Sequence, residues 1–339
     1  MSSPKVSVTM PCYNCEATVG AAIESILEQT CSDLELVAVD DGSSDGTANV
    51  LRDYAARDSR LKPLFLDHQG VVGAANAAIG AAEGKYIARM DADDIALPER
   101  IGKQAALLDI DPGTGLTACR VGFGGDRAKN GGYAHYVDWI NTLVGAEEIS
   151  LNRFVEFPFA NPSIMMRKDL IAAHGPFRDG DFPEDYELIL RWLEAGVKMR
   201  KVDEELLIWN DPPDRLSRNH PKYTVEAFYR IKSEYLFRWL QKHLGPDPKV
   251  GIIGSGRTSR KRYQMLESLG VETAFYVDVD PRKVGMLIRG KKVLHRDEIP
   301  AAGETFLLSY VASWGARDEV AEFLNGRGYV MGRDYLLVS

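Results

Sequence analysis

The sequence predicts an α/β protein built on a parallel sheet, followed by a second, smaller α/β domain. Three observations support this prediction. Strand-type apolar runs alternate with helical apolar stripes over residues 1–100. Carboxylates directly follow two of the runs, at the position where open α/β sheets bind ligands. A strand, a glycine turn and a helix recur after residue 248, which indicates a second unit of the same class.

Four strands are expected in the first part of the chain, each a short apolar run of strand-type residues. They lie at residues 6–10, 34–39, 62–66 and 86–90. Helices are expected between them, over residues 17–29, after Thr47, and over residues 71–82. The first strand should end at Pro11, because proline has no N–H to give to a central ladder.

Composition and charge exclude several classes of protein. The chain has 339 residues, 45% hydrophobic and 27% charged, which is ordinary globular composition and enough for two domains. The net charge of −8 argues against nucleic acid as a partner, since phosphate contacts need a basic surface. No apolar run approaches the roughly 20 residues of a membrane span. The first residues lack the apolar core of a signal peptide.

The four cysteines are sparse, which is typical of a protein in the reducing cytoplasm. Cys12 and Cys15 form a C-x-x-C pair, but the second pair that a zinc site needs is missing. We interpret both as small, partly buried thiols. A redox role is the alternative that the spacing leaves open.

Asp91 and Asp93 follow the strand at residues 86–90 and stand two positions apart, so that an extended chain directs them to one side. Two such carboxylates repel each other unless a cation lies between them. Hard oxygen ligands suit Mg²⁺ or Mn²⁺, usually shared with substrate phosphates. The alternative is that the acids cap the next helix, a role that Asp94 would fill before a helix beginning near Pro98.

A second acidic pair, Asp40 and Asp41, follows the strand at residues 34–39. Turn formation and a helix N-cap at Ser44 or Asp45 would explain the glycines nearby, but they do not require two acids before the turn. Acids thus cluster at two strand ends. This clustering predicts a cation-binding, phosphate-facing edge of the sheet.

These segments together resemble the family 2 nucleotide-sugar glycosyltransferases, which have the GT-A fold. The resemblance is carried by Pro11-x-Tyr13-Asn14, residues 39–45, Asn76 in its small-residue helix, residues 84–87 and Asp91-Ala92-Asp93-Asp94. It implies a GT-A mixed sheet in the first domain. One departure is Ala75, where relatives often have Arg or Lys. A phosphate contact is then either missing or supplied elsewhere.

The resemblance also implies roles for individual residues. The donor nucleotide would be bound by Pro11, Tyr13, Asn14, Asp40, Asp41, Asn76, Asp91 and Ala92. Pro11 and Tyr13 would line the base pocket, and the acids after the second strand would contact the uracil or ribose. Asp91 and Asp93 would hold Mn²⁺ or Mg²⁺.

A helix is expected over residues 184–193, with Glu184 and Asp185 in its first turn. One interpretation is electrostatic, because acids stabilise a helix N-terminus. The resemblance assigns Asp185 as the base that deprotonates the acceptor hydroxyl, which direct displacement requires. Both interpretations hold together if the amides of the first turn keep Asp185 ionised.

Residues 214–220 resemble the family's closing segment, which folds over the donor. The resemblance implies that His220 is a further metal ligand and that Arg215 or Arg218 meets the diphosphate. The alternative is a polar surface loop. A second departure is Asn210, where relatives often have Arg after the Trp.

Glycine-rich residues 113–132 are expected to form a strand at residues 116–121 and otherwise a loop. Long loops in compact domains are usually functional, and we assign this one to the acceptor. Short helices are expected at residues 137–141 and 147–154. Residues 157–167 are expected to enter a further strand, and another is expected at residues 206–209.

Three regions follow from these patterns: a GT-A domain over residues 1–220, a linking helix over 221–247, and a Rossmann-like domain over 248–339. In the last, Gly254, Gly256 and Arg257 open a helix that could hold an anion. Asp278 stands 24 residues after Gly254, near the position of a ribose-binding acid. The third glycine of the dinucleotide motif is absent, so that a structural or regulatory role is favoured over redox catalysis.

The activity implied is inverting, metal-dependent transfer of a sugar from a nucleoside diphosphate donor, with a UDP-sugar favoured. The acceptor would be a hydroxyl of a glycan or lipid-linked glycan in surface polysaccharide biosynthesis. A lipid-linked acceptor would bring a cytoplasmic protein to the inner face of the membrane. The sequence does not set the oligomeric state.

Two alternatives remain. A nucleotidyltransferase would carry a Gly-rich, Lys/Arg-bearing loop after the first strand, where this chain has Pro11-Cys12-Tyr13-Asn14. A nucleotide- or dinucleotide-binding sensor with a degenerate transferase domain is kept open by the departures at Ala75 and Asn210.

Overall fold

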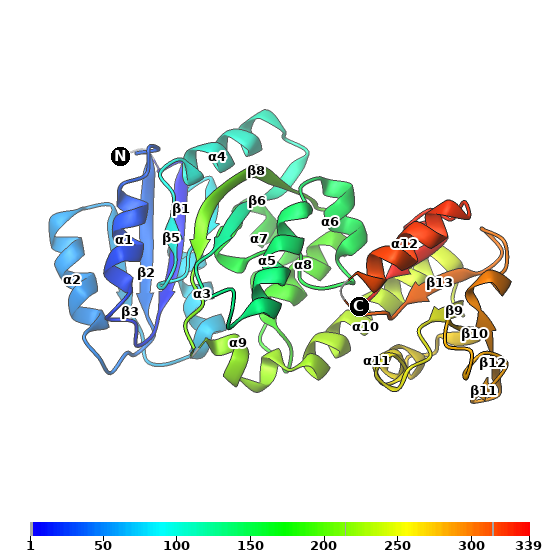
Figure 1. The fold of residues 1–339 in the computed structure, drawn as a ribbon. Coiled ribbons are helices and arrows are strands. Elements are labelled where there is room, and N and C mark those ends of the chain that lie inside the picture. The colour runs from blue at the N-terminus through cyan, green and yellow to red at the C-terminus, as the bar shows by residue number, and fades with distance from the viewer. Residues whose placement is uncertain (1–2, 214, 314) are drawn as a thin grey trace. The chain divides into compact units, whose positions relative to one another are not determined.

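The computed structural model describes residues 3–213, 215–313 and 315–339, which form two compact units (Figure 1). The first unit comprises Met1–Ile149, Pro158–Gly180 and Glu184–Asn219. The second comprises Ser150–Phe157, Asp181–Pro183 and His220–Ser339. Within the described residues, no helix combines the length and the apolar character needed to cross a membrane.

The first unit contains a mixed sheet in the strand order β3-β2-β1-β4-β7-β6-β8-β5. Its strands are β1 (Val6–Cys12), β2 (Leu34–Asp40), β3 (Leu61–Phe65), β4 (Tyr86–Arg89), β5 (Ile95–Ala96), β6 (Thr114–Phe123), β7 (Met165–Arg167) and β8 (Lys198–Trp209). Strands β1 to β4 are parallel, whereas β7 runs antiparallel to β4 and β6. The four strands expected in residues 1–100 are therefore confirmed.

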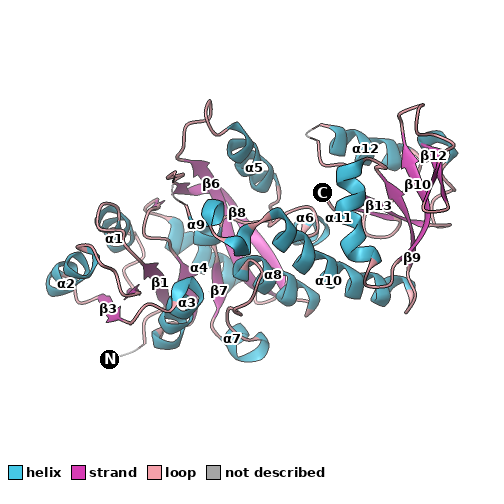
Figure 2. Cartoon of the chain, turned by 90° about the horizontal axis from the view of Figure 1, so that it is seen from below, coloured by secondary structure: helices cyan, strands magenta, loops and turns pink. Residues whose placement is uncertain are grey.

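Helices cover both faces of the parallel strands (Figure 2). They are α1 (Val19–Leu27), α2 (Thr47–Arg57) and α3 (Gly70–Ala81). Strand β2 is buried along its whole length, and its alternate side chains enter two cores. Leu36 and Ala38 join the core that α1 and α2 cover, and Val37 and Val39 pack with Ala74 of α3.

The prediction that the first strand ends at Pro11 is wrong. Strand β1 continues to Cys12, with Pro11 opposite Val39 of β2. Proline is tolerated because the ladder between β1 and β4 stops at Thr9, so that the missing N–H faces the side without a partner strand.

The remaining elements of the first unit surround the antiparallel part of the sheet. They are α4 (Arg100–Ile110), α5 (Gly131–Thr142), α6 (Ala146–Asn152, which crosses into the second unit), the 3₁₀ turn Asn161–Ser163, α7 (Asp169–His174), α8 (Glu184–Glu194) and α9 (Leu216–Asn219). The glycine-rich loop is shorter than predicted. Strand β6 extends to Phe123 and α5 begins at Gly131, which leaves residues 124–130 as the connection.

The second unit has its own sheet, in the order β11-β12-β10-β9-β13-β14. Its elements are the 3₁₀ turn Pro221–Tyr223, α10 (Val225–Leu244), β9 (Lys249–Ile253), α11 (Arg257–Glu267), β10 (Glu272–Asp278), β11 (Leu287–Ile288), β12 (Lys291–His295), the 3₁₀ turn Arg296–Glu298, β13 (Phe306–Ser309), α12 (Ala316–Gly326) and β14 (Tyr335–Leu337). Apart from the short β11, these strands are parallel, as in a Rossmann-like half.

Candidate active site

The loops after β1 and β2 form one surface at the carboxyl edge of the sheet. Asn14, in the left-handed region with φ 47°, donates its N–H to Ser43 Oγ at 2.9 Å. Its Oδ1 accepts the Ser44 N–H at 2.8 Å. The ring of Tyr13, which is 51% exposed, lies against the ring of His68 at 4.4 Å between centroids. An exposed aromatic pair of this kind offers a flat face to a nucleotide base.

Asp40 and Asp41 hold the loops behind this surface. Both are buried, and Asp41 accepts N–H donors from Gln69 at 2.7 Å and Gly70 at 2.9 Å, at the start of α3. Gly42 has φ 71°, and a Cβ there would lie 2.9 Å from the backbone nitrogen of His68. Glycine is therefore required where the loop passes the Tyr13–His68 pair.

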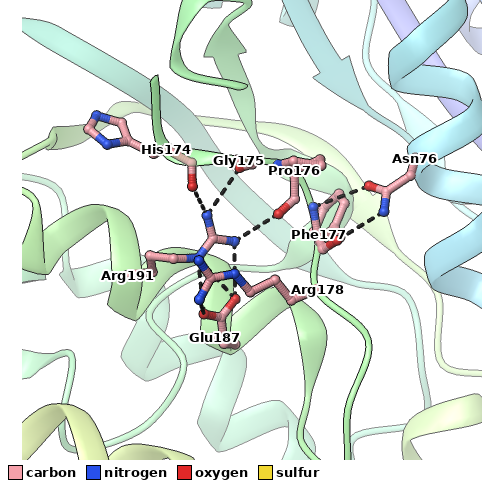
Figure 3. Close-up of polar contacts among 8 residues, drawn as sticks. All are labelled: Asn76, His174, Gly175, Pro176, Phe177, Arg178, Glu187 and Arg191. Carbon is pink, nitrogen blue, oxygen red and sulfur yellow. Dashed lines mark hydrogen bonds and ion pairs between the residues drawn. The ribbon is translucent and has the colours of Figure 1, made fainter. Parts of the chain in front are cut away.

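Asn76, predicted to bind the donor, bonds instead to the protein backbone in this structure. Its Nδ2 donates to Phe177 O at 2.9 Å and its Oδ1 accepts the Phe177 N–H at 3.2 Å (Figure 3). The pair connects α3 to the segment that leads into α8. A donor contact by Asn76 remains a prediction.

The acidic segment after β4 is held by cationic and amide donors. Asp91 Oδ1 accepts from Arg89 Nε at 3.1 Å and Nη2 at 2.8 Å. Asn210, one of the two positions that differ from the family's usual residue, donates its side-chain N–H to the backbone oxygen of Asp93 at 2.7 Å. Ala92 lies buried between the two acids. The segment is thus a supported turn, with Asp91 partly exposed at its edge.

Asp94 does not cap the following helix. That helix, α4, begins at Arg100, and Asp94 Oδ1 accepts the Asn210 N–H at 2.8 Å. Its Oδ2 is buried without a hydrogen-bond partner. Burial, with the neighbouring Asp91 and Asp93, raises the pKa of Asp94 well above its ordinary value.

Arg100, the first residue of α4, supports this segment from inside. It is fully buried, and its Nη2 donates to the backbone oxygens of Arg89 at 2.5 Å and Pro162 at 2.6 Å. Its Nε donates to Gln104, one turn on, at 3.1 Å. The sequence signal was available, because Arg100, Gln104 and Leu108 recur at helical spacing on one face.

Asp185 lies in the first turn of α8, and its Oδ1 accepts the Tyr186 N–H at 2.7 Å. Burial, with the adjacent Glu184, raises the pKa of Asp185 to about 8. The charge of Arg89 opposes the rise and that of Asp91 adds to it, which links Asp185 to the acidic segment. The expectation that backbone amides keep Asp185 ionised is therefore wrong, because the cost of burial exceeds their effect.

A buried arginine in the last turn of α8 holds the segment that precedes the helix (Figure 3). Arg191 forms an ion pair with Glu187, 3.0 Å between Nε and Oε1, and both side chains are almost fully buried. The Arg191 guanidinium also donates to the backbone oxygens of His174, Gly175 and Pro176. Residues 174–177 are thereby held between Arg191 and Asn76.

The segment after β8 gathers around Asp211, which sequence reasoning missed. Arg218 Nη2 donates to its two carboxylate oxygens at 2.6 and 2.7 Å, and Asn130 donates at 2.8 Å. The Arg215 guanidinium lies 4.3 Å from the Trp209 ring and 4.7 Å from the Tyr133 ring. Among the described residues, Arg215 Nη1 is buried without a hydrogen-bond partner and forms a longer ion-pair contact with Asp211, at 3.5 Å.

The predicted metal ligands are not assembled into a cage of protein side chains. In the ranges that the structure describes, no group of three or more His, Cys, Asp or Glu side chains is arranged to hold a metal ion. His220 belongs to the second unit, where its Nδ1 accepts the Lys222 N–H at 3.3 Å. A site shared with a diphosphate needs only one or two carboxylates from the protein, and the acids after β4 fit that requirement.

The second unit keeps part of a dinucleotide-binding turn. Gly254 has φ 101°, Gly256 precedes α11, and Arg257 is its first residue. Asp278, near the ribose-binding position, accepts the Ser255 N–H at 3.2 Å and the Lys283 ammonium at 2.9 Å. Burial alone would raise the pKa of Asp278, but hydrogen bonds from the Ser255 hydroxyl, the Asp280 N–H and the Lys283 ammonium bring it down to about 2. The carboxylate is thus satisfied within the protein, and anion binding at this turn remains a prediction.

Known proteins similar to this chain are glycosyltransferases. The profile of glycosyl transferase family 2 matches residues 7–175. A putative glycosyltransferase, EpsE of Bacillus subtilis, is 31% identical over 66% of this chain and 80% of that protein. The O-antigen biosynthesis glycosyltransferase WbnJ of Escherichia coli is 29% identical over 70% of this chain and 89% of its own length.

Solved structures of glycosyltransferases share the fold of this chain. S. aureus TarS in complex with UDP-GlcNAc superposes with a TM-score of 0.52 at 19% identity, over 78% of this chain and 71% of that one. The mannosyltransferase PcManGT of Pyrobaculum calidifontis, in complex with GDP-Man and Mn²⁺, gives 0.50 at 18% identity, over 80% and 70%. Taken with the strand-end acids and the mixed sheet, these similarities place the chain in glycosyltransferase family 2, with the GT-A fold.

Proposed function

We propose that this glycosyltransferase is inverting and metal-dependent and that its donor is a nucleoside diphosphate sugar, with a UDP-sugar favoured. The observation that carries the proposal is the electrostatic link between Asp185 and the Arg89–Asp91 pair. This link supports a common site for the candidate base and for the carboxylate that would serve the leaving diphosphate. The complexes of similar proteins with UDP-GlcNAc and GDP-Man agree with a donor of this class.

The donor would lie across the loops after β1, β2 and β4. The base would stack on the Tyr13–His68 pair, beside Pro11 and Asn14. The diphosphate would meet Arg215, whose buried Nη1 has no hydrogen-bond partner and whose charge is held by two aromatic rings. Arg218 would join it by leaving Asp211, to which it is bound here.

Asp91 and Asp93 would hold Mn²⁺ or Mg²⁺ together with diphosphate oxygens. The oxygen donors of Asp91 and Asp93 suit either ion. When bound, the ion neutralises charge on the leaving diphosphate. PcManGT was solved with Mn²⁺.

Asp185 would accept the proton of the acceptor hydroxyl. The acceptor oxygen forms a bond to the anomeric carbon as the bond from that carbon to the diphosphate oxygen breaks on the opposite face, so that the configuration inverts. A base is needed because the attacking hydroxyl is a weak nucleophile until its proton is removed. The acceptor would be a glycan or lipid-linked glycan of a surface polysaccharide. The name of the similar protein WbnJ, an O-antigen biosynthesis glycosyltransferase, agrees with an acceptor of this kind. A lipid-linked acceptor would place the reaction at the inner face of the membrane.

The proposal is tested by the melting temperature of the purified protein with UDP, GDP, dTDP and NAD(H), each with and without Mn²⁺. A ligand that binds only the folded state raises the melting temperature according to the ratio of its concentration to its dissociation constant. We expect a metal-dependent rise with UDP. A rise with NAD(H) alone would contradict the proposal and favour a dinucleotide sensor built on the second unit.

A further inference from the structure

The β11–β12 hairpin, residues 286–295, exposes two adjacent apolar side chains at the edge of the second sheet. Strands β11 and β12 pair antiparallel, with Leu287 opposite Lys292 and Ile288 opposite Lys291, and β11 is the last strand of its sheet (Figure 1). Met286 is 54% exposed and Leu287 is 69% exposed. A sheet edge associates readily with other molecules, so that adjacent apolar residues exposed there indicate an interaction surface.

The same segment is basic, although the chain as a whole is acidic. Residues 281–296 contain six Lys or Arg residues and no Asp or Glu, whereas the whole chain has a net charge of −8. Among the described residues, ion pairs join Arg282 to Asp280, Lys283 to Asp278, Arg289 to Glu267 and Lys291 to Glu272. Exposed ion pairs contribute little in water, and the Arg282 side chain is 88% exposed, so that these cations can exchange their partners for other anions.

The turn of the hairpin keeps a cation where the backbone favours a small residue. Arg289 and Gly290 join the two strands with φ 49° and 77°. Two-residue turns with positive φ at both positions favour Asn-Gly or Gly-Gly, because a Cβ is strained in this region. The Arg289 side chain is 57% exposed. A strained position that keeps a long cationic side chain indicates a use for that side chain at the surface.

We propose that the β11–β12 hairpin docks the second unit on an anionic lipid bilayer. Met286 and Leu287 enter the boundary between headgroups and acyl chains, and Arg289 and Lys292 contact lipid phosphates. Peripheral attachment needs both signals, because a few apolar side chains or a few cations alone hold a protein only weakly. Nucleic acid would engage the cations but would leave Met286 and Leu287 without an apolar partner, and the net charge of the chain opposes it.

The benefit of this docking rests on the proposed function, whereas the docking itself does not. A lipid-linked glycan acceptor lies at the bilayer surface. A transferase on a chain attached to that surface meets the acceptor at a raised effective concentration. Because vesicle binding requires neither donor nor metal, the two claims fail separately. Binding to vesicles by a protein that binds no nucleoside diphosphate would support the docking and contradict the proposed function.

The docking is tested by co-sedimentation of the full chain with vesicles, at low and at high salt. One set of vesicles is phosphatidylcholine alone, and the other is phosphatidylcholine and phosphatidylglycerol in equal parts. We expect binding to the mixed vesicles at low salt, about tenfold weaker binding at high salt because exposed charges are screened, and little binding to phosphatidylcholine. Equal binding to both sets, no binding to either, or binding to single-stranded RNA in place of the mixed vesicles would overturn the proposal.

Two variants separate docking from folding. Met286→Ser/Leu287→Ser should bind the mixed vesicles about tenfold more weakly. Arg289→Gly should also bind more weakly, while its melting temperature stays at or above that of the wild type, because glycine relieves the strained φ. The controls Val330→Ser and Lys261→Gln change exposed side chains elsewhere in the second unit and should bind as the wild type does.

The variants also decide against other occupants of the surface. Unchanged vesicle binding by both hairpin variants, or an equal loss in the controls, would overturn the proposal. Light scattering measures the oligomeric state of the same proteins. A wild-type dimer that Met286→Ser/Leu287→Ser dissociates, together with no vesicle binding by the wild type, would overturn the proposal and assign the hairpin to a second copy of the chain.

Discussion

Asp185 has an unusual protonation state for a residue assigned as a base. Burial and the neighbouring Glu184 raise its pKa to about 8, which favours the protonated carboxyl at neutral pH. The raised pKa makes the carboxylate a stronger base when it is ionised. The nearby Arg89–Asp91 pair makes this value sensitive to anything that binds at the acidic segment.

A pH–rate profile follows from this residue. The group must lose its proton to act, so that kcat/KM of the wild type should rise about tenfold per pH unit below the pKa and level off above it. A bound cation would move the midpoint below about 8, because a nearby positive charge favours the ionised form. The measurement is kcat/KM for the donor from about pH 5.5 to 9. Independence of pH across that range would remove Asp185 from the rate-determining proton transfer.

At the scale of elements, the parallel strands were predictable from the sequence because each is a buried apolar run with turn residues on both sides. Other features depended on contacts distant in sequence. Strand β5 has only two residues, Ile95 and Ala96, and forms through pairing with β8. Helix α5 begins at Gly131 and Gly132, although paired glycines in a sequence usually indicate a loop. The roles of Asn210 and Asp211 depend on partners more than 80 positions away in the sequence, which periodicity does not reveal.

The buried ion pair of α8 provides an element-scale prediction. Arg191→Met removes the buried partner of Glu187 and leaves the largely exposed Arg178, 3.4 Å from Glu187 Oε1, so that the free energy of unfolding should fall by about 3 kcal/mol. Because Arg191 also holds the backbone before α8, kcat should fall more than the affinity for UDP. Denaturant unfolding and steady-state kinetics measure the two effects.

The matched control for Arg191 is the double variant Glu187→Leu/Arg191→Met, which removes both charges. It should recover part of the stability that Arg191→Met loses, because no charge is left buried alone. Arg120→Met, on an exposed pair with Asp203, should change stability little. Equal losses for the buried and the exposed arginine would contradict the structural role given to Arg191.

At the scale of the whole molecule, the two units differ in their candidate sites. The first places its acids and arginines at the carboxyl edge of a mixed sheet, where the family resemblance predicted them. The second keeps a Rossmann-like sheet whose candidate ribose acid, Asp278, is already satisfied by Ser255 and Lys283. The sequence could suggest the dinucleotide turn, but not that its carboxylate is engaged within the protein, because Lys283 lies outside the motif.

The second unit also contains a buried lysine whose charge links stability to pH. Burial lowers the pKa of Lys232 from 10.5 to about 7, and its Nζ donates to the backbone oxygens of Val155 and Val338. Between these pKa values the unfolded chain binds more protons than the folded one, so that this group makes stability rise with pH. Lys232→Met should remove that rise, seen as a difference from wild type in melting temperature between about pH 7 and 10. Parallel curves for the two proteins would show that Lys232 stays charged when folded.

The most direct test of the central claim compares Asp185→Asn with wild type in two assays. One assay measures transfer from a UDP-sugar to a glycan acceptor, and the other measures the affinity for UDP with Mn²⁺. The exposed Asp181→Asn, just before the same helix, serves as the control. We predict that Asp185→Asn abolishes transfer and leaves UDP affinity nearly unchanged, because the amide keeps the shape but cannot accept the proton. Transfer at the wild-type rate by Asp185→Asn would contradict the assignment of Asp185 as the base.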